Sequence, residues 1–175
     1  MNPVSLKTTA RGFALLAFGC WPSTVTPATQ ATELEKQQCN SGGAEQNEVQ
    51  VLNNATVLRV TPLYGHVHTS PNTFESRING AVVYVQPPKD LRPEQLTQIV
   101  QCHSARALLG EIDPNQIRND PYWLPNAWLD IDVKPQPGSY AITISANSVK
   151  DGLQVLARAK AYAEMRVAAN SVLGR

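Results

Sequence analysis

The sequence predicts an α+β fold, a four-stranded antiparallel sheet with two helices on one face, in the order β-β-α-β-β-α. Two observations predict it. Four short segments are rich in β-branched residues or alternate apolar and polar residues, whereas two longer segments repeat apolar residues every three or four positions. Each pair of strand segments is followed by one helical segment, and antiparallel strands covered by two helices satisfy that order. A permuted ferredoxin-like sandwich has this arrangement.

The first two predicted strands are short and rich in β-branched residues. They cover residues 56–60 (TVLRV), which alternate, and residues 80–86 (GAVVYVQ). Pro87 and Pro88 follow directly. Because proline has no backbone N–H to donate inside a sheet, the second strand is expected to end there.

The next segment changes to a helical period, over residues 93–109. Pro93 suits a first helical position, and Gly110 suits a C-terminal stop. Residues 111–126 carry three prolines and are expected to be mostly loop. The residues at the spacing of one helix face are Leu96, Ile99, Val100, His103 and Ala107.

The second half of the chain repeats the pattern of two strands and a helix. Residues 127–134 and 139–146 are predicted strands, joined by the turn PQPG. Their alternation leaves one face apolar and one wet, as expected for an antiparallel sheet covered on one side. Ser148 is expected to cap the last helix, with Asp151 in its first turn. The expected apolar stripe of this helix comprises Val149, Leu153, Leu156 and Ala163.

Residues 1–20 are typical of an export signal. Lys7 and Arg11 precede the short apolar run GFALLAFG. A membrane-spanning helix needs about 20 apolar residues. Charged and polar residues interrupt every apolar stretch of the chain before that length, so no transmembrane segment is expected.

Two cleavage positions fit this leader. The residues before Cys20 resemble a bacterial lipobox, which implies that Cys20 is acylated and begins the mature chain. The chain departs from that pattern, because Leu16 lies one residue earlier than the usual leucine and Phe18 is bulky. The alternative is ordinary cleavage near Ala28 or Ala31. Both interpretations place the mature protein outside the cytoplasm: in the periplasm, secreted, or lipid-anchored to the cell envelope.

The charge of the mature chain is nearly balanced. Removal of residues 1–19 takes away two of the 15 basic residues, Lys7 and Arg11, and leaves 13 against 14 acidic residues. A nucleic-acid partner would require a basic face, so that class of partner is not expected. The same balance offers no polybasic attraction to lipid.

Cys39 and Cys102 remain after either cleavage, whereas Cys20 remains only in the lipid-anchored form. In an oxidising compartment two cysteines predict one disulfide, Cys39–Cys102. The alternative is that Cys102 is a small buried residue and Cys39 is free.

The chain is expected to fold as one domain after a linker. Residues 21–45 are rich in Thr, Ser, Gly and Gln and predict a flexible linker. Residues 46–168 sustain apolar periodicity over a length that can bury a core, and residues 169–175 are expected to be a tail. The stretches TFESRINGAVVYV and VQCHSAR resemble an uncharacterised class of small secreted bacterial proteins, over residues 55–165. This resemblance implies export and carries no implication about activity.

Two of the three histidines lie close together in YGHVHTSPN. In a strand, His66 and His68 would point to the same face. With His103 or a carboxylate such as Glu75 they would form a copper or zinc site. Against this, His103 lies within the apolar helix face and is expected to point into the core. The preferred interpretation is a polar strand pair facing solvent and a core histidine bonded to backbone.

Two other groups are candidates for function. Asp130 and Asp132 share one face of a strand, as calcium ligands or an acid–base pair would. No further oxygen ligands or sharp glycine turn accompany them, so a solvated sheet face is preferred. The aromatic loop DPYWLPNAW contributes Tyr122, Trp123 and Trp128, which are typical of partner-binding loops. The preferred interpretation of this loop is a plug at the end of the sheet.

The sequence contains no recognisable catalytic set. It has no G-x-S-x-G, no glycine-rich phosphate loop and no cysteine with an activating histidine on the same face. We therefore expect an exported, non-catalytic protein without a cofactor, whose partner is a protein or a small ligand. The alternative function is a periplasmic copper- or zinc-binding protein that uses the His66/His68 pair.

Overall fold

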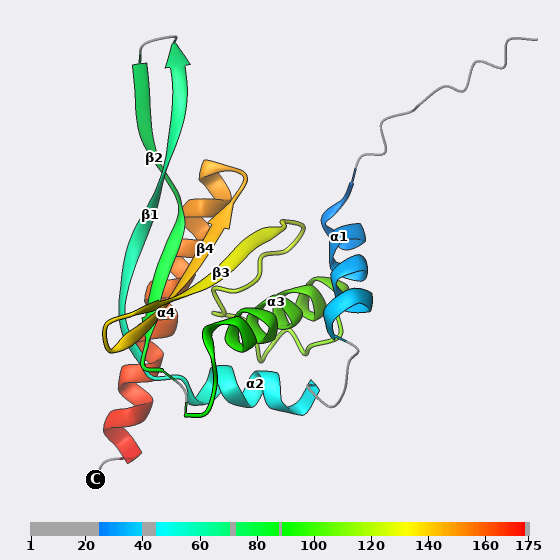
Figure 1. Cartoon of the computed structure of the whole chain (residues 1–175), viewed down its shortest axis with the longest axis vertical. Coiled ribbons are helices and arrows are strands. Elements are labelled where there is room, and N and C mark those ends of the chain that lie inside the picture. The colour runs from blue at the N-terminus through cyan, green and yellow to red at the C-terminus, as the bar shows by residue number, and fades with distance from the viewer. Residues whose placement is uncertain (1–24, 40–44, 71–72, 88, 174–175) are drawn as a thin grey trace, which may run out of the picture.

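A computed structural model describes residues 25–39, 45–70, 73–87 and 89–173 (Figure 1). The helices are α1 (Pro27–Leu34), α2 (Glu45–Asn54), α3 (Pro93–Leu109) and α4 (Val149–Leu173), with a π-helical turn (Glu35–Cys39) directly after α1. The strands are β1 (Val57–Ser70), β2 (Thr73–Val85), β3 (Leu129–Gln136) and β4 (Ser139–Ala146).

The four strands form one antiparallel sheet in the order β1-β2-β4-β3. Its register aligns apolar residues across all four strands, because Val60 opposes Val83, Val83 opposes Ile142, and Ile142 opposes Val133. On the opposite face of β3, Asp132 is exposed to solvent. The α+β class and the four antiparallel strands are therefore confirmed, while the permuted ferredoxin-like arrangement stays a prediction.

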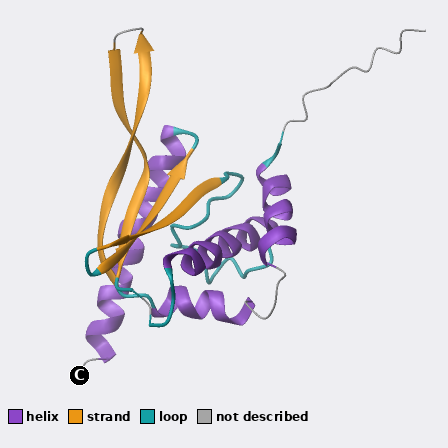
Figure 2. Cartoon of the chain, in the orientation of Figure 1, coloured by secondary structure: helices purple, strands orange, loops and turns teal. Residues whose placement is uncertain are grey.

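Helices α3 and α4 cover the apolar face, with α3 against β3 and α4 against β2 (Figure 2). The start of α3 at Pro93 is confirmed, and the Gln95 side chain accepts a hydrogen bond from the Arg92 N–H at 3.0 Å. Its end at Gly110 is also confirmed, since this glycine has a left-handed φ of 77°. Ser148 caps α4 as expected, because its Oγ accepts from the Asp151 N–H at 3.1 Å.

The predicted apolar stripe of α4 is wrong in part. Val149 and Leu153 are 38% and 48% exposed. Helix α4 instead meets the sheet through Gly152, where an added Cβ would lie 2.6 Å from the carbonyl carbon of Asn79. Since the closest approach is at Gly152, positions three, four, seven and ten residues later face inward. These buried positions are Val155, Leu156, Ala159 and Tyr162.

The β1–β2 hairpin is much longer than the strands predicted over residues 56–60 and 80–86. Strand β4 pairs with β2 only between Gly80 and Val85, so residues 73–79 of β2 pair with β1 alone. The distal half of the hairpin therefore extends beyond the sheet as a two-stranded arm (Figure 1). Tyr64, His66 and residues 75–77, whose side chains the structure describes, are exposed, so no buried face imposes apolar alternation on them. The sequence pattern therefore did not predict this part of the hairpin.

The prediction of a flexible linker over residues 21–45 is wrong for the residues that the structure describes. Residues 27–39 are helical, and Ala31 is fully buried. Helix α1 begins where Thr26 Oγ1 accepts from the Thr29 N–H, and it packs against α3. Helix α2 begins at Glu45 and was likewise not predicted. At the other end, α4 continues to Leu173, through most of the expected tail.

Candidate functional site

A cavity of about 320 Å³ lies where three parts of the fold meet: the end of α2, the C-terminal half of α4 and the loop after α3. Helix α3 contributes His103 to its inner wall. The other described lining residues are Leu52 and Asn53 from α2, Tyr162, Met165 and Arg166 from α4, and loop residues 115–120 and 122.

His103 and Asp120 form a buried pair in this wall. His103 Nε2 contacts Asp120 Oδ2, and the other carboxylate oxygen accepts from the Tyr122 N–H at 2.7 Å. One carboxylate thus fixes both the imidazole of α3 and the backbone of the loop. The core-facing direction of His103 is confirmed, because it is 3% exposed, but its partner is a carboxylate rather than a backbone carbonyl.

Two tyrosines pack behind the same wall. Tyr122 and Tyr162 meet edge to face, with ring centroids 5.9 Å apart. The Tyr162 hydroxyl donates to Leu52 O at 2.8 Å, whereas the Tyr122 hydroxyl is buried without a hydrogen-bond partner among the described residues. Burial raises the pKa of Tyr162 and raises that of Tyr122 well above its usual value. Both rings are therefore neutral structural groups at physiological pH.

Two arginines of α4 hold the cavity walls in place. Arg166 donates to the backbone and side-chain oxygens of Asn53 and lies over the Tyr162 ring, 4.8 Å from its centroid. Arg158 donates to Trp123 O at 3.0 Å, and burial lowers the pKa of its guanidinium. Helix α4 is thereby joined to α2 on one side and to the loop on the other.

The lining of this cavity is rich in polar side chains of the kind that recognise ligands. In a buried His–Asp pair the histidine can act as a general base, with the aspartate holding its ring in place. Here, however, His103 Nδ1 is enclosed in protein and has no partner among the described residues. In the described part of the chain, the lining contains no serine, threonine, cysteine or lysine that could act as a nucleophile beside it. The pair joins α3 to the loop, and the lining also holds amide and guanidinium side chains.

The proposed metal ligands are not brought together by the described residues, among which no group of three His, Cys, Asp or Glu side chains could hold an ion. His103 is bonded to Asp120 in the core. Glu75 pairs with Arg77 at 2.6 Å, and the register places it opposite Val67, on the other face of the arm from His66. His66 is exposed. The side chain of His68 lies outside the described residues, so its part in a metal site stays a prediction.

The aromatic loop is divided between core and surface. Tyr122 is buried, so it cannot form part of a partner-binding surface. Trp123 and Trp128 are half-buried; Trp123 Nε1 donates to Ile117 O, and Trp128 Nε1 donates to Asp130 Oδ1. The loop therefore closes the end of the core, as preferred from sequence, with two indole edges left accessible.

Asp130 and Asp132 lie on the exposed face of β3, as the sequence predicted. Asp132 is 3.4 Å from Lys134 Nζ, a surface ion pair of the kind that contributes little to stability. Neither carboxylate lines the cavity.

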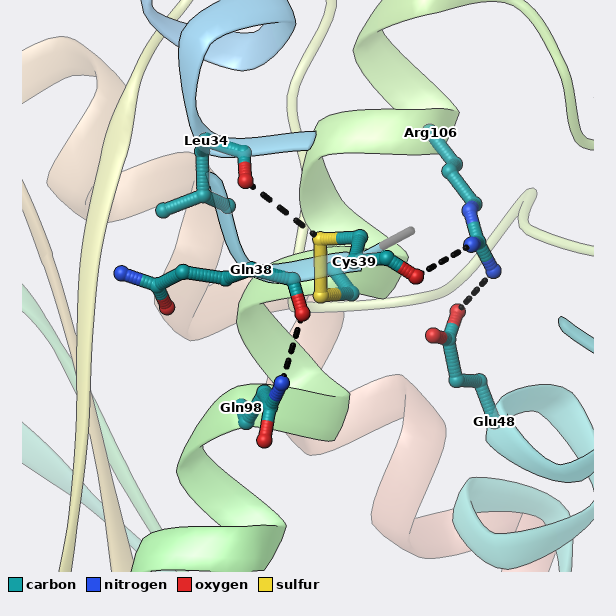
Figure 3. Close-up of a disulfide and its surroundings, with 7 residues drawn as sticks. Leu34, Gln38, Cys39, Glu48, Gln98 and Arg106 are labelled. Carbon is teal, nitrogen blue, oxygen red and sulfur yellow. Dashed lines mark hydrogen bonds and ion pairs between the residues drawn. A yellow bond between two sulfur atoms is a disulfide. The ribbon is translucent and has the colours of Figure 1, made fainter. Parts of the chain in front are cut away.

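A disulfide joins the N-terminal segment, residues 27–39, to α3, and the predicted Cys39–Cys102 pairing is confirmed. The two sulfur atoms are 2.05 Å apart (Figure 3). One turn away on α3, Gln98 Nε2 donates to Gln38 O at 2.6 Å. The disulfide and this hydrogen bond hold the π-helical turn flat against α3.

A buried ion pair between Arg106 and Glu48 lies beside the disulfide (Figure 3). Arg106 Nη1 is 2.9 Å from Glu48 Oε2, and its Nη2 donates to Cys39 O at 3.4 Å. Arg106 thus connects α3, α2 and the N-terminal segment. Sequence reasoning missed this pair, because the two residues lie 58 positions apart and no spacing rule relates them.

Comparisons with known proteins found no matching family, no matching curated protein and no matching solved structure. The resemblance to small secreted bacterial proteins therefore stays a prediction. None of the helices in the described part of the chain is long and apolar enough to cross a membrane.

Proposed function

We propose that this chain is an exported, non-catalytic binding protein, and that it binds a small ligand in the cavity between α2, α4 and the loop after α3. The observation that carries the proposal is the cavity itself. Its volume of about 320 Å³ lies within the range of ligand sites, and its walls are already fixed by the His103–Asp120 pair and by Arg166. Because the side chains of a pre-formed site are already ordered, little conformational entropy is lost when a ligand binds.

The disulfide supports the location. Protein disulfides persist in oxidising compartments and are rare where thiols are kept reduced. Cys39–Cys102 closes a separation of 63 residues and is buried against α3, as a permanent structural bridge would be. Together with the export signal predicted over residues 1–20, it favours the periplasm, the medium or the outside of the cell envelope.

Native mass spectrometry tests the binding proposal. The mature protein is dialysed against a small-molecule extract of the cells that make it, and retained masses are recorded. We expect one small-molecule adduct, lost in Asn119→Trp, which fills the cavity mouth, and kept in Asn147→Trp, which is exposed elsewhere. The absence of any adduct would refute small-ligand binding. An adduct that survives Asn119→Trp would place the ligand outside this cavity.

A further inference from the structure

The lining of the cavity carries uncompensated positive charge. Arg118 and Arg166 both line it, and neither forms an ion pair with a carboxylate among the described residues. The one carboxylate among the described lining residues, Asp120, already has both oxygens engaged by His103 and by the Tyr122 backbone. The charge of the two guanidiniums is therefore available to a ligand.

The two arginines differ in how they are held. Arg166 is fixed by its bonds to Asn53 and by the ring of Tyr162, so its position is set before any ligand arrives. Arg118 is exposed and makes no hydrogen bond or ion pair within the described part of the chain. One guanidinium is thus held in place by the protein, and the other has its hydrogen-bond donors free for a bound group.

Neutral donors complete the lining. Asn115, Gln116 and Asn119 bring side-chain amides from the loop, and Asn119 Nδ2 has only the weak acceptor Met165 Sδ, at 3.4 Å. Guanidinium and amide N–H groups donate to oxyanions, and guanidinium bonds to carboxylate or phosphate are charge-assisted. Of the lining residues that the structure describes, Asp120 is the only acidic one, and its oxygens are already engaged.

We propose that the cavity binds a small anion through a carboxylate or phosphate group, with Arg118 and Arg166 as its charge partners. This inference rests on the proposed function as a binding protein and names the ligand class of that site. Specificity for anions follows from the two guanidiniums, and the amides of the loop would bond the remaining oxygens.

A nuclear magnetic resonance titration of the mature protein tests the inference. The probes are succinate, inorganic phosphate and the neutral analogue succinamide. We expect succinate or phosphate, and not succinamide, to shift the backbone amides of residues 115–119 and 162–166. The anion whose shift changes saturate at the lower concentration identifies the preferred group. Added sodium chloride should weaken the binding, because the guanidinium of Arg118 is exposed.

Variants separate a charge effect from a structural one. Arg118→Gln should lower the affinity for the anion about tenfold or more, without changing the unfolding midpoint. A tenfold change corresponds to about 1.4 kcal/mol. Arg166→Gln should also lower the affinity for the anion, and it should lower the stability of the fold because Arg166 bonds to Asn53. The matched control is Arg59→Gln, since Arg59 lies over Tyr84 on the opposite face of the sheet.

The outcomes distinguish the two proposals. Equal binding of succinamide, or unchanged affinity in Arg118→Gln, would overturn the anion inference and leave the binding proposal standing. If none of the three probes shifts the cavity residues, the anion inference also fails, and the dialysis and mass measurement decides the binding proposal independently.

Discussion

Gly152 is the residue on which the contact between α4 and β2 depends. A Cβ at this position would approach the backbone of Asn79 to 2.6 Å, and a backbone cannot swing aside as a flexible side chain can. Alanine favours a helix over glycine by about 1 kcal/mol. We nevertheless expect Gly152→Ala to lower the free energy of unfolding by about 2 kcal/mol, because overpacking outweighs that gain.

Urea unfolding measures this effect. Gln154→Ala, two residues along α4 and exposed, is the control and should change stability by less than about 0.5 kcal/mol. A Gly152→Ala protein as stable as the natural one would show that α4 and β2 are not in close contact.

The two tyrosines behind the cavity should respond oppositely to loss of their hydroxyls. Tyr122→Phe removes a buried hydroxyl with no hydrogen-bond partner in the described part of the chain and should raise the free energy of unfolding by about 1 kcal/mol. Tyr162→Phe removes the bond to Leu52 O and should lower it by about the same amount. The two substitutions are chemically identical, so each controls for the other in urea unfolding at neutral pH.

The same tyrosines make stability fall in alkali. Burial raises the pKa of both above the unfolded value of about 10, so the unfolded chain loses protons that the folded chain keeps. Their contribution is complete below pH about 10 and is lost as the pH rises through the folded pKa. Tyr122→Phe should reduce this alkaline loss, and an unchanged slope of stability against pH would contradict the burial of Tyr122.

Among the elements, the N-terminal segment should depend most on one covalent bond. Closing a loop across the 63 positions between Cys39 and Cys102 stabilises the fold by about 4 kcal/mol in the chain-entropy model. We expect the Cys39→Ala/Cys102→Ala double variant to lose about that much in urea unfolding, and α1 to become sensitive to protease. Thiol titration of the denatured, unreduced protein that finds both cysteines free would exclude the bond.

The hairpin arm gives the test of the alternative function. Calorimetry with Cu(II) and Zn(II) should find no binding tighter than about 10 μM, roughly −7 kcal/mol, at the His66/His68 pair. A closed zinc site uses four ligands, and the register puts Glu75 on the other face from His66. Tighter binding that is lost in His66→Ala/His68→Ala would establish the metal function instead.

Elements whose periodicity comes from the core could be predicted from the sequence. Strands β3 and β4, helix α3 with Pro93 and Gly110 at its ends, and the cap at Ser148 follow from alternation, helical spacing and capping. The arm and α1 could not be predicted in this way. The arm side chains that the structure describes, such as Tyr64, His66 and Glu75, are exposed and impose no apolar alternation. The main buried contact of α1 is a single alanine, Ala31, in a polar sequence.

The candidate site was largely hidden from the sequence for a different reason. It is assembled from residues of α2, α3, α4 and a loop, which no local spacing rule connects. Of the cavity residues, only the inward direction of His103 could be predicted, from the apolar helix face. Outside the cavity, the disulfide could be predicted from the count of cysteines in an exported chain. The partners Asp120, Arg166 and Tyr162 required the three-dimensional structure.

For the whole molecule, the decisive prediction concerns how the chain is processed. Labelling of cells with an alkynyl fatty acid distinguishes the two cleavage positions, because only acylation at Cys20 predicts a label, and Cys20→Ala should then abolish it. Cleavage near Ala28 or Ala31 would instead cut within α1, where Ala31 is fully buried. A mature N-terminus at residue 29 or 32, read by mass spectrometry, would contradict the lipid-anchored form.

The early start of α1 also sets how far a lipid-anchored molecule could stand from its membrane. From Cys20 to Pro27, where α1 begins, there are seven residues, which span at most about 25 Å when fully extended. A linker through residue 45 would instead have reached about 90 Å. A lipid-anchored form would therefore be held close to the bilayer, and it would meet ligands near that surface.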